Sequence, residues 1–222
     1  AFGCDPQGDP GVLDPLTIRF SSQESFTDWQ ARDDNTAGEL RIGTGSEIIA
    51  AVQTKQQTVV FTDRSVSALQ FIGAPFTFGL SEVSTNTSIL SQNAAVAVGD
   101  AVYWIGNDVF YRYDGNVSII PCPVEEYVFD NVNTSQLSKV VSGSNSEFNE
   151  VWWFYPSAAS ENNDSYVVYN YLEKIWFYGT LDRSAWDESG VSGFPIAAST
   201  DGNIYFQENG FSDGSTNPPS AL

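Results

Sequence analysis

The sequence predicts an all-β fold of the β-propeller type. Three observations carry this prediction: short runs rich in Val, Ile and aromatic residues, tight polar turns between them, and a loose internal repeat. Gly, Asp, Asn and Ser bound most of the runs, as expected for strands joined by turns. The predicted strands are residues 16–20, 48–52, 59–62, 66–71, 102–105, 109–113, 151–155, 166–171, 175–178 and 204–206.

Two tight turns in the middle of the chain predict an antiparallel meander. Residues 106–108 (Gly-Asn-Asp) separate two aromatic runs, and residues 114–116 (Asp-Gly-Asn) separate the second run from a third. Turns this short connect neighbouring antiparallel strands. Residues 125–128 and 134–139 are the expected helical turns, because Pro121 and Pro123 end any longer helix on the amino side.

The repeat consists of a strand of small residues followed by aromatic strands. Its four copies begin at residues 49–52, 95–98, 139–142 and 196–199. The aromatic anchors Phe61, Trp104, Trp153 and Phe206 are 43, 49 and 53 residues apart. A period of roughly 40 to 50 residues is typical of four-stranded propeller blades, whose inner strand is crowded and favours small side chains. The alternative is a β-sandwich with coincidental spacing.

The repeat also predicts the domain organisation. Residues 1–46 are expected to form a partial blade and a connecting loop, and residues 47–222 the remaining blades, giving four to five blades in one domain. Because the sequence starts without Met, we expect it to be part of a longer chain that completes a larger propeller.

Composition excludes several classes of protein. With 9 Lys+Arg against 28 Asp+Glu the net charge is −19, which disfavours binding to nucleic acid or to anionic lipid. The absence of His excludes His-based catalytic triads and the commonest transition-metal ligand. No stretch approaches the roughly 18 apolar residues of a membrane span, so membrane insertion is not expected.

The motifs that carry chemistry are weak. Cys4 and Cys122 form no metal or redox motif, and we expect two small buried side chains. Residues 43–46 (Gly-Thr-Gly-Ser) lack the Lys of a phosphate-binding loop. Two further signals are weak. These are an acidic loop for calcium, with Asp5, Asp9 and Asp14, and four glycosylation sequons, at Asn86, Asn116, Asn133 and Asn163.

The many carboxylates raise the possibility of a glycosidase, with tryptophans stacking on sugars. Four of the aspartates instead occupy turn sequences beside Gly, where local hydrogen bonds account for them. These are Asp100, Asp114, Asp201 and Asp213. The tryptophans lie mostly inside predicted strands, where packing accounts for them: Trp29, Trp104, Trp152, Trp153, Trp176 and Trp186. The sequence therefore predicts no catalytic residue, including Asp28, Asp108 and Asp164, and no cofactor or metal site.

A family resemblance adds what composition does not carry. From about Gly3 to Gly210 the chain resembles structural proteins of tailed bacteriophages, in particular the tail nozzle or hub family of short-tailed phages, the tail tubular protein B type. The matching motifs are residues 3–6 (GCDP), 14–21 (DPLTIRFS), 27–29 (TDW), 60–63 (VFTD), 71–73 (FIG), 75–79 (PFTFG), 102–104 (VYW), 110–115 (FYRYDG) and 149–156 (NEVWWFYP).

The resemblance implies a non-enzymatic virion protein with a β-propeller, in a sixfold ring of its own copies around the DNA channel. Adaptor and tail-fibre or tail-spike proteins are then its expected partners, and DNA passes without specific binding. A wall of carboxylates suits such a conduit because it repels phosphate. A carbohydrate- or receptor-binding propeller module of the tail is the alternative, and a glycosidase is a weaker one.

Overall fold

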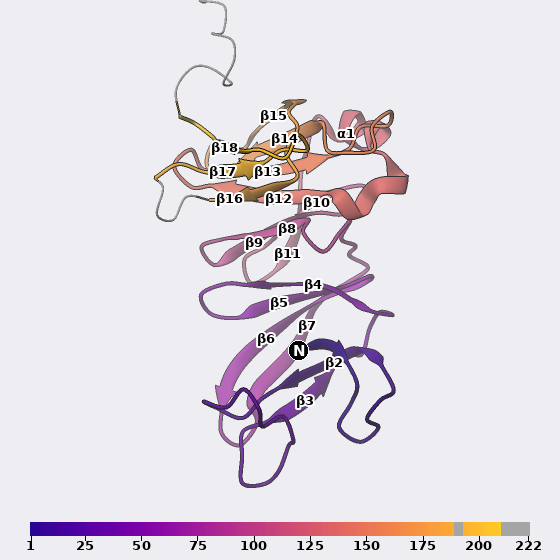
Figure 1. Cartoon of the computed structure of the whole chain (residues 1–222), viewed down its shortest axis with the longest axis vertical. Helices are drawn as coiled ribbons and strands as arrows, with labels where there is room; N and C mark the ends of the chain where they lie inside the picture. The colour runs from indigo at the N-terminus through magenta and orange to yellow at the C-terminus, as the bar shows by residue number, and fades with distance from the viewer. Residues whose placement is uncertain (189–192, 210–222) are drawn as a thin grey trace, which may run out of the picture. The chain divides into compact units, whose positions relative to one another are not determined.

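The computed structural model describes residues 1–188 and 193–209 and confirms the all-β prediction (Figure 1). The described residues form five antiparallel sheets, three of four strands and two of three strands. These open sheets fit the propeller-like or β-sandwich class. The chain divides into an N-terminal unit, Ala1–Phe129, and a C-terminal unit, Asp130–Leu222.

The N-terminal unit contains three sheets, in each of which the strands pair in chain order. The first is β1 (Phe2–Cys4), β2 (Asp14–Phe20) and β3 (Gly38–Arg41). The second is β4 (Ile48–Gln53), β5 (Thr58–Thr62), β6 (Ser65–Gly73) and β7 (Thr77–Thr85). The third is β8 (Ala95–Val98), β9 (Ala101–Ile105), β10 (Phe110–Tyr113) and β11 (Val117–Ile120), which contains the meander that the two tight turns predict.

The C-terminal unit contains two sheets. The larger is β12 (Val141–Asn145), β13 (Glu150–Tyr155), β14 (Ser165–Asn170) and β15 (Ile175–Thr180), and the smaller is β16 (Ala185–Asp187), β17 (Ile196–Ala198) and β18 (Ile204–Phe206). Both predicted helical turns are confirmed. The α-helix α1 (Glu125–Asn131) begins after the two prolines, and the 3₁₀ helix η1 (Thr134–Lys139) is capped by Asn133, whose side chain accepts a hydrogen bond from the amide of Ser135.

Small residues in the opening strand lie opposite the large aromatic anchors of the next strand. Ala50 pairs with Phe61, Ala95 with Trp104, and Ser142 with Trp153. All three anchors are at most 1% exposed. A small cross-strand neighbour leaves room for each ring, so the repeat read from the sequence reflects a packing requirement.

The sheets of the N-terminal unit pack through these buried faces. Leu16 and Ile18 of the first sheet and Ile42, directly after β3, form one hydrophobic cluster with Val60 and Leu69 of the second. The rings of Phe61 and Trp104 join the second sheet to the third, edge to face with centroids 5.0 Å apart. The core of this unit therefore runs between successive sheets.

The fourth copy of the repeat differs from the prediction. Its sheet opens at β16, so residues 196–198 form the central strand, and the proposed anchor Phe206 is 59% exposed. Trp186 of β16 packs beside β12 instead, where Gly143 leaves space: a Cβ on Gly143 would lie 2.2 Å from the Trp186 ring. The indole stacks on Trp152 with centroids 5.4 Å apart and donates to the carbonyl of Ser144.

Candidate functional site

A long hairpin in the N-terminal unit extends beyond the sheet that carries it. Strands β6 and β7 are nine residues each, but β5 pairs with β6 only from Val66 to Leu69. The remaining part of the hairpin, residues 70–80, contains Phe71, Ile72, Phe76 and Phe78 and carries no charged residue. An apolar segment without a third strand beside it leaves large hydrophobic side chains exposed to solvent.

Two rings anchor the base of this extension. Phe71 and Phe78 are cross-strand partners with ring centroids 5.8 Å apart, and Phe20 at the end of β2 packs edge-on against Phe78 at 4.9 Å. Gly38, opposite Phe20 in β3, admits the ring, because a Cβ there would lie 2.5 Å from it. The hairpin is thereby packed against the first sheet.

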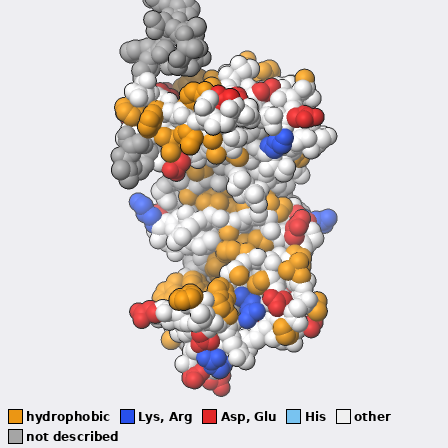
Figure 2. All heavy atoms as spheres, viewed as in Figure 1, with side chains coloured by type: hydrophobic (Ala, Val, Ile, Leu, Met, Phe, Trp, Pro, Cys, Tyr) orange, Lys and Arg blue, Asp and Glu red, His pale blue; other side chains and the backbone are white. Residues whose placement is uncertain are grey.

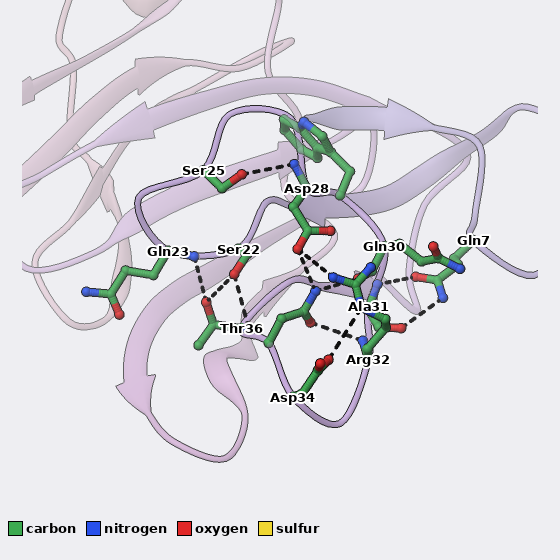
Figure 3. A network of polar contacts seen from close by, with 12 residues as sticks. Gln7, Ser22, Gln23, Ser25, Asp28, Gln30, Ala31, Arg32, Asp34 and Thr36 are labelled. Atoms are coloured by element: carbon green, nitrogen blue, oxygen red, sulfur yellow. Dashed lines mark hydrogen bonds and ion pairs between the residues drawn. The ribbon is translucent and has the colours of Figure 1, made fainter.

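The loop between β2 and β3, residues 21–37, is held by a network of polar contacts (Figure 3). The Asp28 carboxylate accepts hydrogen bonds from Arg32 at 2.8 Å and from Asn35 at 3.1 Å. At the other side of the loop the amide of Gln23 donates to Thr36 Oγ1 at 2.6 Å. These contacts give the loop a defined shape without secondary structure.

Further contacts join the loop to its surroundings. Gln7 makes a reciprocal pair with the backbone of Ala31, donating at 3.1 Å and accepting at 2.6 Å (Figure 3). Thr77 in β7 donates through its hydroxyl to the carbonyl of Thr36 at 3.2 Å, which connects the loop to the hairpin. The two walls of the site are thus positioned by direct hydrogen bonds.

Between loop and hairpin lies a groove of about 730 Å³, which we call the aromatic groove. Its walls carry the rings of Phe20, Phe26, Phe71 and Phe78, with Ser, Gln and Thr side chains between them. Glu24 is the ionisable residue of the lining. Figure 2 shows hydrophobic side chains gathered over this end of the hairpin, with acidic side chains nearby.

The electrostatics around the aromatic groove are acidic. Residues 21–37 contain Glu24, Asp28, Asp33 and Asp34 against one cation, Arg32. Hydrogen bonds from Asn35 and then from Arg32 lower the pKa of the Asp28 carboxyl, so it stays ionised in mild acid. Arg32 lies between Asp28 at 2.8 Å and Asp34 at 3.4 Å, and its charge is therefore offset locally.

A second, polar pocket of about 390 Å³ lies in the C-terminal unit. Asp164 accepts two hydrogen bonds from Ser157 at 2.7 Å, and Asp182 accepts one from Ser199 at 2.9 Å. The Arg183 guanidinium lies 4.9 Å from the centre of the Tyr205 ring. The side chains of this pocket are thus engaged with one another, as in a structural network.

The other residues weighed from the sequence are dispersed. Asp5 accepts from the amide of Gly11, whereas Asp14 pairs with Arg41 at 2.6 Å, so the acidic loop does not converge on one point. Asp108 is exposed in the turn between β9 and β10. Asp100, Asp114 and Asp201 lie in hairpin turns, and Asp213 lies outside the described residues.

Burial distinguishes the sequons, the cysteines and the tryptophans. Asn163 is only 3% exposed and donates to the carbonyls of Lys139 and Arg183, so this sequon is not a surface site. Cys4 and Cys122 are free thiols and only half-buried, not inside the core as expected, because Cys4 lies in the edge strand β1 and Cys122 in the segment between β11 and α1. Five of the six tryptophans lie in strands; Trp29 lies in the loop and donates to the carbonyl of Phe26.

The aromatic groove was not predicted from the sequence. Of its residues, Phe20 and Phe71 belong to predicted strands, and others belong to the motifs that carry the family resemblance. The signal that could have indicated it is the segment 70–80, in which apolar residues continue on both sides of a Gly-Ala-Pro turn. A strand with one buried face alternates apolar and polar residues, so the loss of alternation indicates a surface that the sheet itself does not cover.

Comparison with known proteins adds no family: no protein-family model matches the chain, and no curated protein matches it. Across residues 1–188 and 193–209 no helix is long and apolar enough to cross a membrane. In the same part of the chain no three acidic or Cys side chains are grouped so that they could hold a metal ion.

Proposed function

We propose that this chain is a non-enzymatic structural component of a bacteriophage tail, in the nozzle or hub, and that it forms part of a ring around the DNA channel. Its partners are then copies of itself, in sixfold arrangement, and adaptor and tail-fibre or tail-spike proteins. The motif resemblance is the basis for proposing a virion protein, and the all-β fold and the charge of −19 are consistent with this proposal.

The observation that carries a binding role over a catalytic one is the chemistry of the aromatic groove. Its walls are aromatic, and the polar groups around it are engaged in positioning the loop (Figure 3). Exposed aromatic side chains on a rigid support are typical of protein interfaces. Asp28 and Asp164, two carboxylates that a hydrolase reading would use, each accept hydrogen bonds from neighbouring side chains.

The conduit role is tested with DNA. Labelled duplex is titrated with the chain at about 50 and 200 mM salt, with a basic polypeptide as positive control. We expect no binding at either salt concentration, because the net charge repels phosphate. Micromolar affinity that falls steeply with salt would indicate a basic face and a DNA-gripping role, and would contradict a passive conduit.

Location and activity are tested separately. Gold-labelled antibodies against the chain are expected to decorate the tails of intact phage particles, and particles without label would contradict the virion role. Turnover of polysaccharide or peptidoglycan is expected to be absent. Turnover that disappears in Asp28→Asn or Asp164→Asn, with the fold intact, would establish an enzyme instead.

The receptor-binding alternative has one observation in its favour. Phe26 is an exposed ring beside Ser22, Gln23 and Ser25, a combination of stacking surface and hydrogen-bonding groups that carbohydrate sites also use. A glycan array distinguishes the two roles: selective retention of one class of sugar, lost in Phe26→Ala, would favour the receptor-binding module over the ring component.

A further inference from the structure

We propose that the aromatic groove binds an extended apolar segment of a different protein, with Lys or Arg residues on either side of the segment. This inference rests on the proposed function, for which it names the chemistry of one partner. The groove then serves as a docking site for another tail component, distinct from the contacts between copies of this chain.

The extent of the apolar surface favours a protein over a small molecule. The groove's volume of about 730 Å³ is within the range of ligand pockets, but the apolar surface continues beyond it. Phe26 is 88% exposed, Phe76 72% and Phe71 69%, and Ile72 on the same hairpin is 56% exposed. A partner segment that fills the groove and continues along the hairpin covers these side chains, which a single small ligand does not.

The charge around the groove favours basic residues on the flanks of the bound segment. The loop 21–37 has a net charge of −3, because it carries four carboxylates and one arginine, and Glu24 of this loop lines the groove itself. The hairpin residues 70–80 contribute no charge of either sign. Basic residues that flank an apolar segment therefore find complementary charge along the loop wall of the groove, whereas acidic residues are repelled there.

The same charge argues against a second copy as the occupant. Every copy carries the same acidic loop and a net charge of −19, so a second copy meets this rim at a higher electrostatic cost than a basic protein does. One apolar segment of this chain, residues 175–181, lies between two cations, Lys174 and Arg183, but Glu173 and Asp182 beside them offset both charges. A different, more basic protein fits the rim better.

The site is arranged for binding before a partner arrives. Hydrogen bonds from Gln23 to Thr36 and from Thr77 to Thr36 hold the loop against the hairpin, and the Phe20 and Phe78 rings close the base. A preformed groove avoids the entropy loss of ordering a loop on binding. The exposed rings can then contribute directly to affinity.

The test is a peptide array probed with the fluorescently labelled whole chain. Ten-residue peptides have randomised apolar cores, and each core is presented with flanking Lys pairs, Glu pairs or Ser pairs. We expect retention on a subset of Lys-flanked cores, at least tenfold weaker retention on the same cores with Glu flanks, and a smaller difference at about 0.5 M salt, where charges are screened beyond about 4 to 5 Å. The selected peptides are then resynthesised for titration by fluorescence anisotropy.

Matched variants locate the binding. Phe26→Ala and Phe76→Ala are expected to weaken the selected peptide about tenfold or more, as truncation of interface rings does. Phe206→Ala removes a similarly exposed ring that belongs neither to the groove lining nor to the hairpin 70–80, and is expected to have no effect. Glu24→Gln is expected to weaken the Lys-flanked peptide a few-fold, and Glu126→Gln, an exposed acid on α1, to leave it unchanged. Circular dichroism confirms that each variant is folded.

Several outcomes would overturn the proposal. These are equal retention of Lys- and Glu-flanked cores, no retention of any core, or affinity unchanged in both Phe26→Ala and Phe76→Ala. Concentration-dependent dimers in sedimentation that disappear in Phe26→Ala would assign the groove to a second copy instead. A negative array leaves the virion location untouched, and absent labelling of phage tails leaves the array result untouched, so the two failures are distinguishable.

Discussion

Adding one methyl group at Gly143 should destabilise the C-terminal unit through Trp186. The backbone of Gly143 in β12 is covered by the indole of Trp186 in β16, and a Cβ at this position would meet the ring at 2.2 Å and its Cγ at 2.4 Å. Real Cβ atoms do not approach a ring atom so closely. In Gly143→Ala either the backbone of β12 or the indole has to move.

The magnitude follows from what the indole loses when it moves. Trp186 stacks on Trp152 at 5.4 Å and on Phe154 at 5.6 Å, and each such pair contributes about 0.5–1.5 kcal/mol. Its Nε1 also donates to the carbonyl of Ser144 at 2.8 Å, a contribution of about 1 kcal/mol. Displacement therefore lowers the free energy of unfolding by about 3 kcal/mol, at the upper end of the about 1–3 kcal/mol known for overpacked cores.

The assay is urea denaturation followed by tryptophan fluorescence, with Gly43→Ala as the matched control. Gly43 has open space around its Cβ position and no positive φ, so alanine there should change stability by less than about 0.5 kcal/mol. Gly143→Ala should lower the unfolding midpoint and also red-shift the native emission, because a displaced indole meets water.

A double-mutant cycle of Gly143→Ala and Trp186→Ala tests the reasoning, which is refuted if the two stability changes are additive. If the clash with Trp186 is the cause, Gly143→Ala is nearly neutral in the Trp186→Ala background, and the coupling equals most of the single-mutant loss. A loss of about 3 kcal/mol that persists in that background would mean that β12 itself does not accept a side chain at this position.

Three further outcomes can be measured. Trp104→Ala, which removes a fully buried ring beside Phe61, should destabilise the N-terminal unit by about 3–5 kcal/mol in the same urea assay. Burial raises the pKa of the Cys122 thiol to about 11, so in Cys4→Ser its reaction with a maleimide should accelerate about tenfold per pH unit between pH 8 and 10, and a plateau near pH 8.5 would contradict this. Burial alone would raise the pKa of the Glu188 carboxyl, but hydrogen bonds from serines at the end of β12 outweigh it and lower that pKa. Its stabilising contribution is then complete above the unfolded pKa of about 4.3 and lost as the pH falls through the lower folded value, and Glu188→Gln should remove this part of the acid dependence of the urea midpoint.

The strands that the sequence predicted correctly are those with buried aromatic or β-branched runs. β5, β9 and β13 contain the anchors Phe61, Trp104 and Trp153, and each is bounded by turn residues, so local composition and burial agree. Both helical turns were also predicted, because the prolines before α1 restrict the chain locally. Where local composition and burial favour the same secondary structure, a single sequence is sufficient to predict it.

The strands that the sequence did not predict depend on their partners. β1, β3 and β16 are three or four residues long, and β7 (TFGLSEVST) has mixed composition; all four are strands because a neighbouring strand offers hydrogen bonds. The shift of the fourth repeat has the same origin, since Trp186 is placed by Gly143, 43 residues earlier. The aromatic groove could not be predicted because it too depends on tertiary structure: Phe26 and Phe71 line one groove only once the loop and the hairpin are folded.

Strand order in the described sheets follows the order of synthesis. Each sheet is complete within one continuous stretch of chain, from β4 to β7 or from β12 to β15, and its hydrogen-bonded neighbours are consecutive in sequence. Such local pairing requires little loop closure before contacts form, which favours fast folding for an all-β chain. A sheet can therefore form as soon as its last strand leaves the ribosome, before the next sheet has been made, and within the N-terminal unit its exposed face is then covered by the sheet that follows.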